Sequence, residues 1–352
     1  MRTNREKRLF HFETPISVSA SASAVGCEEY KGPYGEYFDF HDPSDRFGAK
    51  TWELAEGEMA KCALNLALKK RKISHEEIDI LFAGDLQNQC MASSAGLYSF
   101  GIPYIGLYGA CSTSVEGLLL AALTMNAQKK VARTAVVTSS HNCAAERQFR
   151  LPIEYGGQRT PTAQWTATAA GAFLLEKEKK GMQDSACIRT GMIGRAVDGG
   201  ISDANNMGAA MAPAVCDSLR TYFEESGEKV EDFDLIVTGD LGTEGSAILE
   251  VLCRDVGFSL LDRHFDCGAN LYDLQKQDAH AGGSGCGCIA SMLAAYFVPK
   301  LSRGEHRRLL VLATGALMSP SSIQQGGSII GIAPAIVMEY EKGEKKRARP
   351  DS

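Results

Sequence analysis

Residues 109–128 read GACSTSVEGLLLAALTMNAQ, a cysteine-containing turn followed by a long apolar run. The run is apolar on nearly every side at helical spacing, which predicts a helix buried all round. The small residues before it allow a tight turn out of a preceding strand, so Cys111 is expected at the helix N-terminus. The free amides there favour an anion, which predicts a lowered pKa for Cys111 and a site for a carboxylate. An inert buried thiol beside an ordinary helix cap is the alternative.

Apolar strands and amphipathic helices alternate around this run. The periodicity predicts helices over residues 53–70, 113–128, 209–225, 246–256 and 288–301, and strands over 78–83, 135–138, 169–176, 235–238, 309–313 and 332–339. Such alternation is typical of mainly parallel sheets with helices on their faces. A central helix that is apolar on all sides then favours an α/β fold built as a five-layer α/β/α/β/α sandwich.

Four segments of the first half recur, in the same order, in the second half. They pair residues 80–86 with 236–241, 109–123 with 282–296, 135–139 with 310–314, and 172–179 with 335–342. Similarities in one order predict a duplicated unit with loop insertions. We therefore expect two halves, residues 1–180 with Cys111 and residues 181–352. Chance likeness between apolar strands and Ala-rich helices is the alternative.

The composition is that of a globular protein. Of 352 residues, 44% are hydrophobic and 23% are charged. The formal net charge of -6 disfavours contact with phosphate backbones, so no nucleic-acid partner is expected. No apolar run is long enough to cross a membrane, and no apolar core follows the basic start. The sequence therefore predicts a soluble protein without a signal peptide or transmembrane segment.

Eleven cysteines, an odd number without a secretion signal, indicate free thiols in a reducing compartment. No Cys-x-x-Cys motif and no paired Cys/His spacing occurs, so no metal site is expected. The glycine-rich run at 282–287 lacks the Gly-Lys-Ser/Thr ending of a phosphate-binding loop. The sequence therefore predicts no cofactor.

The residues around Cys111 resemble the thiolase and ketoacyl-synthase superfamily, whose nucleophilic cysteine starts a central buried helix. A closer resemblance, from about Thr14 to Glu341, is to the stage V sporulation protein AD family. It rests on several long segments that ordinary thiolases do not share. These segments are GDLQNQ at 84–89, SSHN at 139–142, AERQFR at 145–150, EYGGQ at 154–158, MAPA at 211–214, GGSGC at 282–286 and ATGAL at 313–317.

This resemblance implies a thiolase-like fold and a role in endospore formation. The family belongs to a membrane-associated complex that moves dipicolinic acid, with calcium, into the forespore and out again during germination. Its AD subunit is the soluble one and binds dipicolinate. It would associate peripherally with the spore inner membrane, beside other subunits of the complex. Because thiolase-like proteins typically pair through their sheets, the resemblance also implies a homodimer.

Acyl transfer needs more than a thiol, because a base and an oxyanion hole must cooperate with it. His280 lies where thiolases place a histidine before a glycine-rich turn, which favours catalysis with Cys111. However, the loop at 321–328 has no second cysteine, and residues 239–243, GDLGT, stand where a ketoacyl synthase has its histidine. Losing one group of a cooperating set costs orders of magnitude in rate. The incomplete set favours binding over turnover.

Dipicolinate is a flat ring with two carboxylates, so its pocket needs a slot, oriented amides and cations. The cationic candidates are Arg147, Arg150 and Arg159, each of which could instead form an ordinary surface ion pair. Asp240 and Asp85 occupy duplicated strand ends, where both could instead cap loops. The candidate ligand-binding residues are Cys111, Ser112, Ser140, His141, Arg147, Asp240 and Gly283.

Two other functions stay open. One is a thiolase-like or ketoacyl-synthase-like acyltransferase with Cys111 as nucleophile and His280 as its catalytic partner. The other is a purely structural scaffold.

Overall fold

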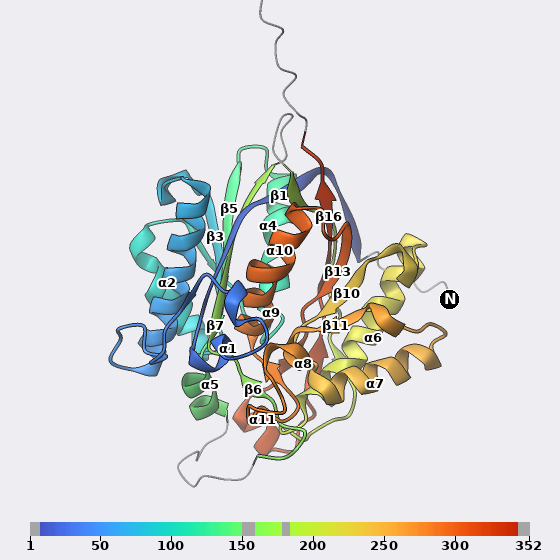
Figure 1. The fold of residues 1–352 in the computed structure, drawn as a ribbon. Helices are drawn as coiled ribbons and strands as arrows, with labels where there is room; N and C mark the ends of the chain where they lie inside the picture. The colour runs from blue at the N-terminus through green and yellow to red at the C-terminus, as the bar shows by residue number, and fades with distance from the viewer. Residues whose placement is uncertain (1–7, 150–158, 178–183, 344–352) are drawn as a thin grey trace, which may run out of the picture.

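Five layers lie side by side in the computed structural model of the chain, which describes residues 8–149, 159–177 and 184–343 (Figure 1). One outer layer contains α2 (Trp52–Arg71) and α3 (Met91–Leu97). The other contains α6 (Met207–Ser226) and α7 (Gly242–Asp255). Between them, two groups of strands enclose a central helical layer. The predicted five-layer α/β sandwich is confirmed.

The strands of the two halves follow the same order. In the first half the order is β4 (Tyr104–Gly106), β3 (Ile80–Gly84), β5 (Arg133–Ser140), β7 (Ala169–Lys177) and β1 (Leu9–Val25). In the second half it is β11 (His264–Asp266), β10 (Leu235–Thr238), β13 (Arg308–Leu312), β16 (Ala335–Glu341) and β8 (Ser185–Met192). Each position in the first list has its counterpart in the second, as a duplicated unit requires. The predicted boundary between residues 180 and 181 lies outside the described residues.

Strand β1 joins the two halves into one sheet. It pairs antiparallel with β7 from Ile16 to Val25 and with β8 from Leu9 to Val18. Neither β1 nor β8 was predicted from the sequence. Much of β1 reads SVSASASAV, in which small residues replace the larger β-branched side chains that mark a strand. Small side chains fit here because helices pack closely on both faces of the strand.

The central layer contains α4 (Thr113–Ala127), α9 (Cys286–Met292) and α10 (Val298–Ser302). Helix α4 is buried on almost all sides, as its sequence predicts. The predicted helix over 288–301 is instead interrupted by a π-helical segment, Leu293–Phe297. The hydroxyl of Ser21 donates to the carbonyl of Ala294 within this segment (2.7 Å). A side chain that takes a helix carbonyl is a recognised cause of such irregularity.

The short elements mostly gather at one end of the sandwich, the lower end in Figure 1. They are α1 (Cys27–Tyr30), β2 (Phe40–His41), α5 (Asn142–Phe149), β6 (Trp165–Thr166), β9 (Val197–Asp198), α8 (Cys267–Leu271), β12 (Gly283–Ser284), β14 (Gly315–Leu317), α11 (Pro320–Gln324) and β15 (Ile330–Ile332). The predicted strand over 332–339 is divided between β15 and β16. The loops at this end surround the N-termini of α4 and α9.

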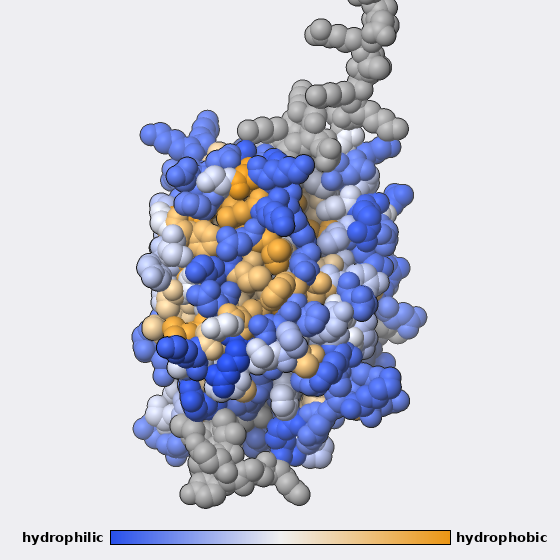
Figure 2. Space-filling view, turned by 60° about the vertical axis from the view of Figure 1, so that its left-hand side comes forward, coloured by the Kyte–Doolittle hydropathy of each residue, from blue (hydrophilic) through white to orange (hydrophobic). Residues whose placement is uncertain are grey.

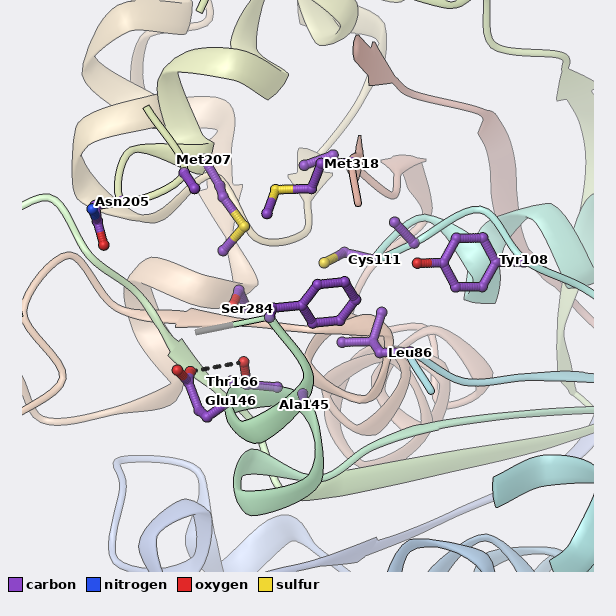
Figure 3. Close-up of a pocket in the computed structure, with 14 residues that line it drawn as sticks. Leu86, Tyr108, Cys111, Ala145, Glu146, Thr166, Asn205, Met207, Ser284 and Met318 are labelled. Carbon is purple, nitrogen blue, oxygen red and sulfur yellow. Dashed lines mark hydrogen bonds between the residues drawn. The ribbon is translucent and has the colours of Figure 1, made fainter. Parts of the chain in front are cut away.

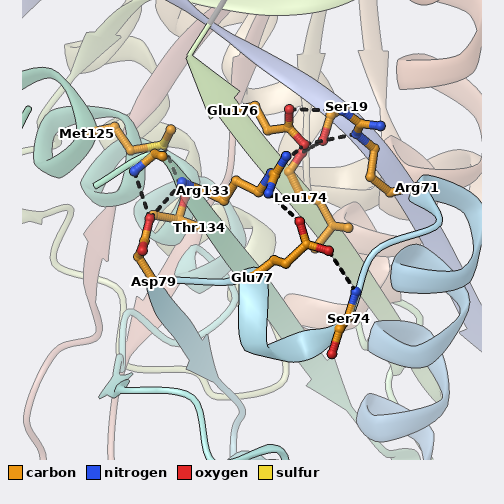
Figure 4. A network of polar contacts seen from close by, with 11 residues as sticks. Ser19, Arg71, Ser74, Glu77, Asp79, Met125, Arg133, Thr134, Leu174 and Glu176 are labelled. Atoms are coloured by element: carbon orange, nitrogen blue, oxygen red, sulfur yellow. Dashed lines mark hydrogen bonds and ion pairs between the residues drawn. The ribbon is translucent and has the colours of Figure 1, made fainter. Parts of the chain in front are cut away.

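The opposite end of the first half is fastened by ion pairs (Figure 4). Glu176 on β7 accepts from Arg71 at the end of α2 (2.9 Å) and from Arg133 on β5 (3.2 Å). Arg133 also pairs with Glu77 (2.6 Å). These contacts tie an outer helix to two strands, far from the loops around Cys111.

Among the described residues, no helix combines the length and hydrophobicity needed to cross a membrane.

Candidate ligand pocket at Cys111

Cys111 lies in a tight turn between β4 and α4. Ala110 has a positive φ of 50°, which reverses the chain just before the cysteine. The hydroxyl of Thr113 donates to the carbonyl of Ala110 (2.7 Å) and accepts from the amide of Gly109 (3.0 Å). These bonds hold the turn and place Cys111 two residues before the first residue of α4. The predicted position of Cys111 at the start of the buried helix is therefore correct.

The predicted ionisation of Cys111 is wrong. Its side chain is only 5% exposed. Burial raises its pKa well above the ordinary value, and the neighbouring carboxyl of Asp240 raises it further. Loss of water around the thiolate therefore outweighs the favourable helix terminus. The structure presents a neutral thiol.

A cavity of about 60 Å³ opens at Cys111 (Figure 3). The sulfur atoms of Cys111, Met207 and Met318 face a common space in this view. The loops after β3 and β14 and the start of α6 supply part of the wall, and α5 supplies another part. The lining residues are Leu86, Tyr108, Ala110, Cys111, Ala145, Glu146, Phe149, Thr166, Ala204, Asn205, Met207, Ser284, Ala316 and Met318.

The cavity combines apolar walls with a few neutral polar groups and one acid. The polar groups come from Tyr108, Thr166, Asn205 and Ser284, in addition to the thiol. The acid is Glu146, whose carboxylate accepts from the hydroxyl of Thr166 (3.2 Å). No lysine or arginine is among the described lining residues. This lining favours a mostly apolar ligand and disfavours an uncompensated anion.

Several predicted ligand-binding residues support the loops instead of lining the cavity. The Ser112 hydroxyl donates to the carbonyl of Gly109 (2.7 Å). The Ser140 hydroxyl donates to the carbonyl of Ala167 (2.7 Å). His141 is buried, with Nε2 2.9 Å from the carbonyl oxygen of Asp45, and was expected at the pocket mouth. Since β5 runs to Ser140 and α5 begins at Asn142, His141 stands between two regular elements and not in the expected loop.

The predicted charged partners are engaged elsewhere. Arg147 forms an ion pair with Glu53 on α2, and Arg159 forms one with Asp278 (2.7 Å). His280 lies within 2.8 Å of Asp278 and 2.7 Å of the carbonyl of Thr160, and does not line the cavity. Arg150 lies outside the described residues.

Gly283 and Asp240 lie just behind the wall. The carbonyl of Gly283 accepts from the Gln164 amide (2.9 Å), and the next residue, Ser284, lines the cavity. Asp240 is fully buried against the Cys111 thiol. Of the predicted set, the structure therefore brings Cys111, Gly283 and Asp240 together.

Sequence reasoning missed most of the wall. Glu146 and Phe149 stand in the segment 145–150 that carries the family resemblance, and Ala316 stands in the segment 313–317. The signal in those segments was present, but a dianionic ligand favours a cation, and Arg147 was predicted in place of its neighbour Glu146. Asn205 and Met318 lie in loops and Met207 begins α6, and none of the three belongs to a recognisable motif.

The layers, the duplicated strand order and the pocket at the start of the central helix define a thiolase-like protein. The tetronic acid condensing enzyme AbyA1 is similar with a TM-score of 0.58 at 16% identity, covering 92% of this chain and 99% of that chain. Acetamide-bound OleA of Xanthomonas campestris has a TM-score of 0.58 at 14% identity, covering 93% and 100%. At these identities the likeness shows the fold alone.

The sequence comparisons are more specific. The family model described as stage V sporulation protein AD (SpoVAD) matches residues 6–339. Stage V sporulation protein AD of Bacillus subtilis (strain 168) is 38% identical over 337 residues, covering 96% of this chain and 98% of the relative. The chain belongs to the stage V sporulation protein AD family and is a sporulation protein.

Proposed function

We propose that this protein binds dipicolinic acid in the cavity at Cys111 without catalysis, as a subunit of the spore membrane complex that moves dipicolinate into the forespore and out at germination. The observation that carries the proposal is the place of Cys111, a thiol only 5% exposed, at the wall of a mostly apolar cavity. An anionic nucleophile is disfavoured there, whereas apolar walls with a few polar groups are typical of a binding pocket.

The charge of the lining favours the calcium chelate over the free dianion. Two uncompensated carboxylates beside Glu146 would be strongly unfavourable in a partly apolar cavity. Calcium neutralises them and accepts oxygen ligands such as a carboxylate or an amide carbonyl. Glu146 and Asn205 supply those two groups on the wall. Calcium is here part of the cargo and not a resident metal.

The walls of the cavity can adapt to a ligand. The cavity is narrow, at about 60 Å³, and two methionines form part of its wall. Met207 and Met318 are unbranched and can change shape at a modest energy cost. We expect these two side chains to move apart around the ligand.

Membrane association and a homodimer are part of the same proposal. The protein would lie peripherally on the spore inner membrane and contact other subunits of the complex. The edge strand β4 supports pairing of two copies, because all three of its residues are exposed and no strand pairs with its outer side among the described residues. Such an edge is a template for another strand.

The strand and the segments before and after it in the chain carry exposed apolar side chains. Tyr98 is 80% exposed and Ile105 is 43% exposed, and Met91 and Tyr108 are also exposed. Figure 2 shows a broad hydrophobic area, bordered by hydrophilic residues, on a face turned forward from the left of Figure 1. Exposed apolar surface of this kind is typical of an interaction site.

Calorimetric titration tests the binding proposal. Wild-type protein should bind dipicolinate more tightly with equimolar calcium than without it. Glu146→Gln should weaken binding of the chelate by at least about tenfold, without weakening binding of the free acid, because only the chelate uses the carboxylate. Met318→Trp should fill the cavity and weaken both. The matched controls Glu244→Gln and Val251→Trp change exposed positions on α7.

Wild-type protein that produces no heat with millimolar dipicolinate, with or without calcium, would refute the proposal. The acyltransferase alternative is tested by intact mass spectrometry after incubation with acyl-CoA. We expect no acyl adduct on Cys111, because its thiol is neutral. An adduct that is absent in Cys111→Ala would establish the alternative.

A further inference from the structure

Asp240 and Asp85 occupy equivalent positions in the two halves, each directly after a strand and a glycine. Asp85 follows β3 and caps its own loop. Its carboxylate accepts from the amides of Gln87 (2.8 Å) and Ser93 (2.7 Å) and from the Ser93 hydroxyl (2.6 Å). This is an ordinary structural role for an aspartate at a strand end.

In the second half another residue caps the loop. Asp266 accepts from the amides of Leu241 (3.0 Å), Gly242 (2.9 Å) and Ala269 (2.8 Å) and from the Thr238 hydroxyl (2.7 Å). Asp240 is therefore not needed as a cap. No hydrogen bond of standard geometry reaches either oxygen of its carboxyl group among the described residues.

Asp240 is nevertheless held firmly in an unusual conformation. Its φ of 68° lies in the left-handed region, and its backbone carbonyl accepts from the Gln164 side chain (2.6 Å). The residue is fully buried. Asp240 is thus a buried carboxyl group in a strained backbone position, and it does not cap a loop as the equivalent Asp85 does. These features together indicate that Asp240 has a function of its own.

The ionisable groups that face Asp240 come from three elements and the Cys111 turn. They are Asp266 on β11, Cys267 on α8, Cys286 and Cys288 on α9, and Cys111. None of them carries a positive charge. Three nearby groups lower the pKa of the Asp240 carboxyl, against the larger effect of burial. They are the Cys111 thiol, the Cys288 thiol and the Gly285 amide.

The two halves also differ in the cysteine at the start of the central helix. Cys286 starts α9 as Cys111 starts α4, and Asp85 is among the acids near it. The Cys286 thiol donates to the carbonyl of Ser139 (2.9 Å). Each half thus places a cysteine near the acid of the other half. Of these two cysteines and two acids, Cys111 is the residue that lines the cavity.

The proton in this acid pair belongs on Asp240. Two adjacent buried carboxyls cannot readily both be ionised. Four donors stabilise a charge on Asp266, whereas Asp240 has none of comparable geometry. Burial and the charge of Asp266 accordingly raise the pKa of Asp240 well above its usual range.

We propose that Asp240 is a positioning residue of the ligand pocket: it keeps its proton in the folded protein and lies as a neutral acid beside the Cys111 thiol. Cys111 then stays a neutral thiol at the cavity wall, where it donates to a ligand carboxylate. The last step rests on the proposed function, and the first step does not.

Infrared spectroscopy at pH 7 tests the first step without any ligand. A protonated carboxyl group has a carbonyl stretching band that a carboxylate lacks. The spectrum of wild-type protein minus that of Asp240→Asn should contain this band. A difference spectrum without it would overturn the proposal. The same comparison with Glu244→Gln, an exposed acid, should show only loss of carboxylate absorption.

Alkylation of Cys111 by iodoacetamide, followed by peptide mass spectrometry, is the second readout. In wild-type protein the rate should stay low to above pH 9, with the half-buried Cys27 as internal reference. Asp240→Asn should preserve that profile, because the amide is neutral like the protonated acid that it replaces. A profile shifted by one pH unit, or about tenfold in rate at fixed pH, would overturn the proposal. The wild-type profile alone is decisive if the variant does not fold, since rapid alkylation at neutral pH also contradicts a neutral thiol.

The two proposals fail separately. A protein with the infrared band and slow alkylation but no affinity for dipicolinate would contradict only the proposed function. Binding of dipicolinate to a protein without the band would contradict only the role of Asp240.

Discussion

Cys111 and Cys286 begin the two central helices, yet burial raises the pKa of both thiols. Helix termini favour anions by about 0.3–1 kcal/mol at exposed sites. Complete loss of water disfavours a thiolate by more than that, so burial prevails. The same effect acts on the buried acids around the pocket. At the scale of the residue, burial favours the protonated form of these thiols and acids.

Glu29 gives a stability test of this principle. Burial raises its pKa from the usual 4.5 to about 7, although Tyr272 donates to it (2.5 Å). Between these pH values the unfolded chain releases a proton that the folded chain keeps, so the contribution of Glu29 to stability falls as pH rises. The slope is at most about 1.4 kcal/mol per pH unit.

Replacement of Glu29 by Gln should remove that slope. Urea unfolding at several pH values between about 4.5 and 7 measures this. As pH rises, the free energy of unfolding of the variant should increase relative to that of wild-type protein. The exposed variant Glu76→Gln should run parallel to wild type. Parallel curves for Glu29→Gln would show that Glu29 is ionised in the folded protein.

At the scale of the element, glycine and small residues set how closely α9 approaches the sheet. A Cβ atom on Gly171 of β7 would lie 2.4 Å from the carbonyl oxygen of Ala290 on α9. No rotamer change relieves a clash with backbone. The N-terminus of α9, and with it Cys286 and Cys288, depends on this contact.

Gly171→Ala should therefore destabilise the protein by about 1–3 kcal/mol, the usual range for overpacking. Chemical denaturation measures the change. Gly106→Ala on β4 is the matched control, because its Cβ would meet only the movable Tyr104 ring, at 3.2 Å. Equal stabilities for the two variants would mean that α9 can shift without loss.

How well each helix or strand could be predicted from the sequence depends on the size of its side chains. Helix α4 and strands β5 and β7 carry strong hydrophobic patterns and were predicted within a few residues. Strand β1 was missed because serine and alanine give little signal, although the strand is central. The cavity wall was mostly missed for another reason. It is assembled from loops distant in sequence, and only the fold brings Glu146, Asn205 and Met318 together.

At the scale of the whole molecule, duplication explains both the symmetry and its loss. The two halves share a strand order, but β1 links them into one sheet, and the equivalent acids Asp85 and Asp240 have different surroundings. A pocket between the two halves can therefore have one strand-end acid, Asp85, in a structural role and the other, Asp240, beside the ligand pocket. The sequence similarities predicted the repeat, whereas the divergence is visible only in the contacts.

The exposed edge of the first half leads to a prediction about assembly. Analytical ultracentrifugation should find a dimer for wild-type protein. Ile105→Lys places a charge on β4 and should give monomers, since a buried unpaired charge opposes association. Val251→Lys, at a 57% exposed site on α7, should remain dimeric. A wild-type monomer would contradict the proposed pairing, and a dimer unaffected by Ile105→Lys would place the interface away from β4.

A crystal structure of the protein grown with calcium and dipicolinate tests the central claim most directly. We predict density for the chelate in the cavity between Cys111, Glu146 and Asn205, with Met207 and Met318 displaced and no covalent bond to sulfur. An empty cavity at saturating ligand, or ligand bound only elsewhere on the chain, would contradict the account.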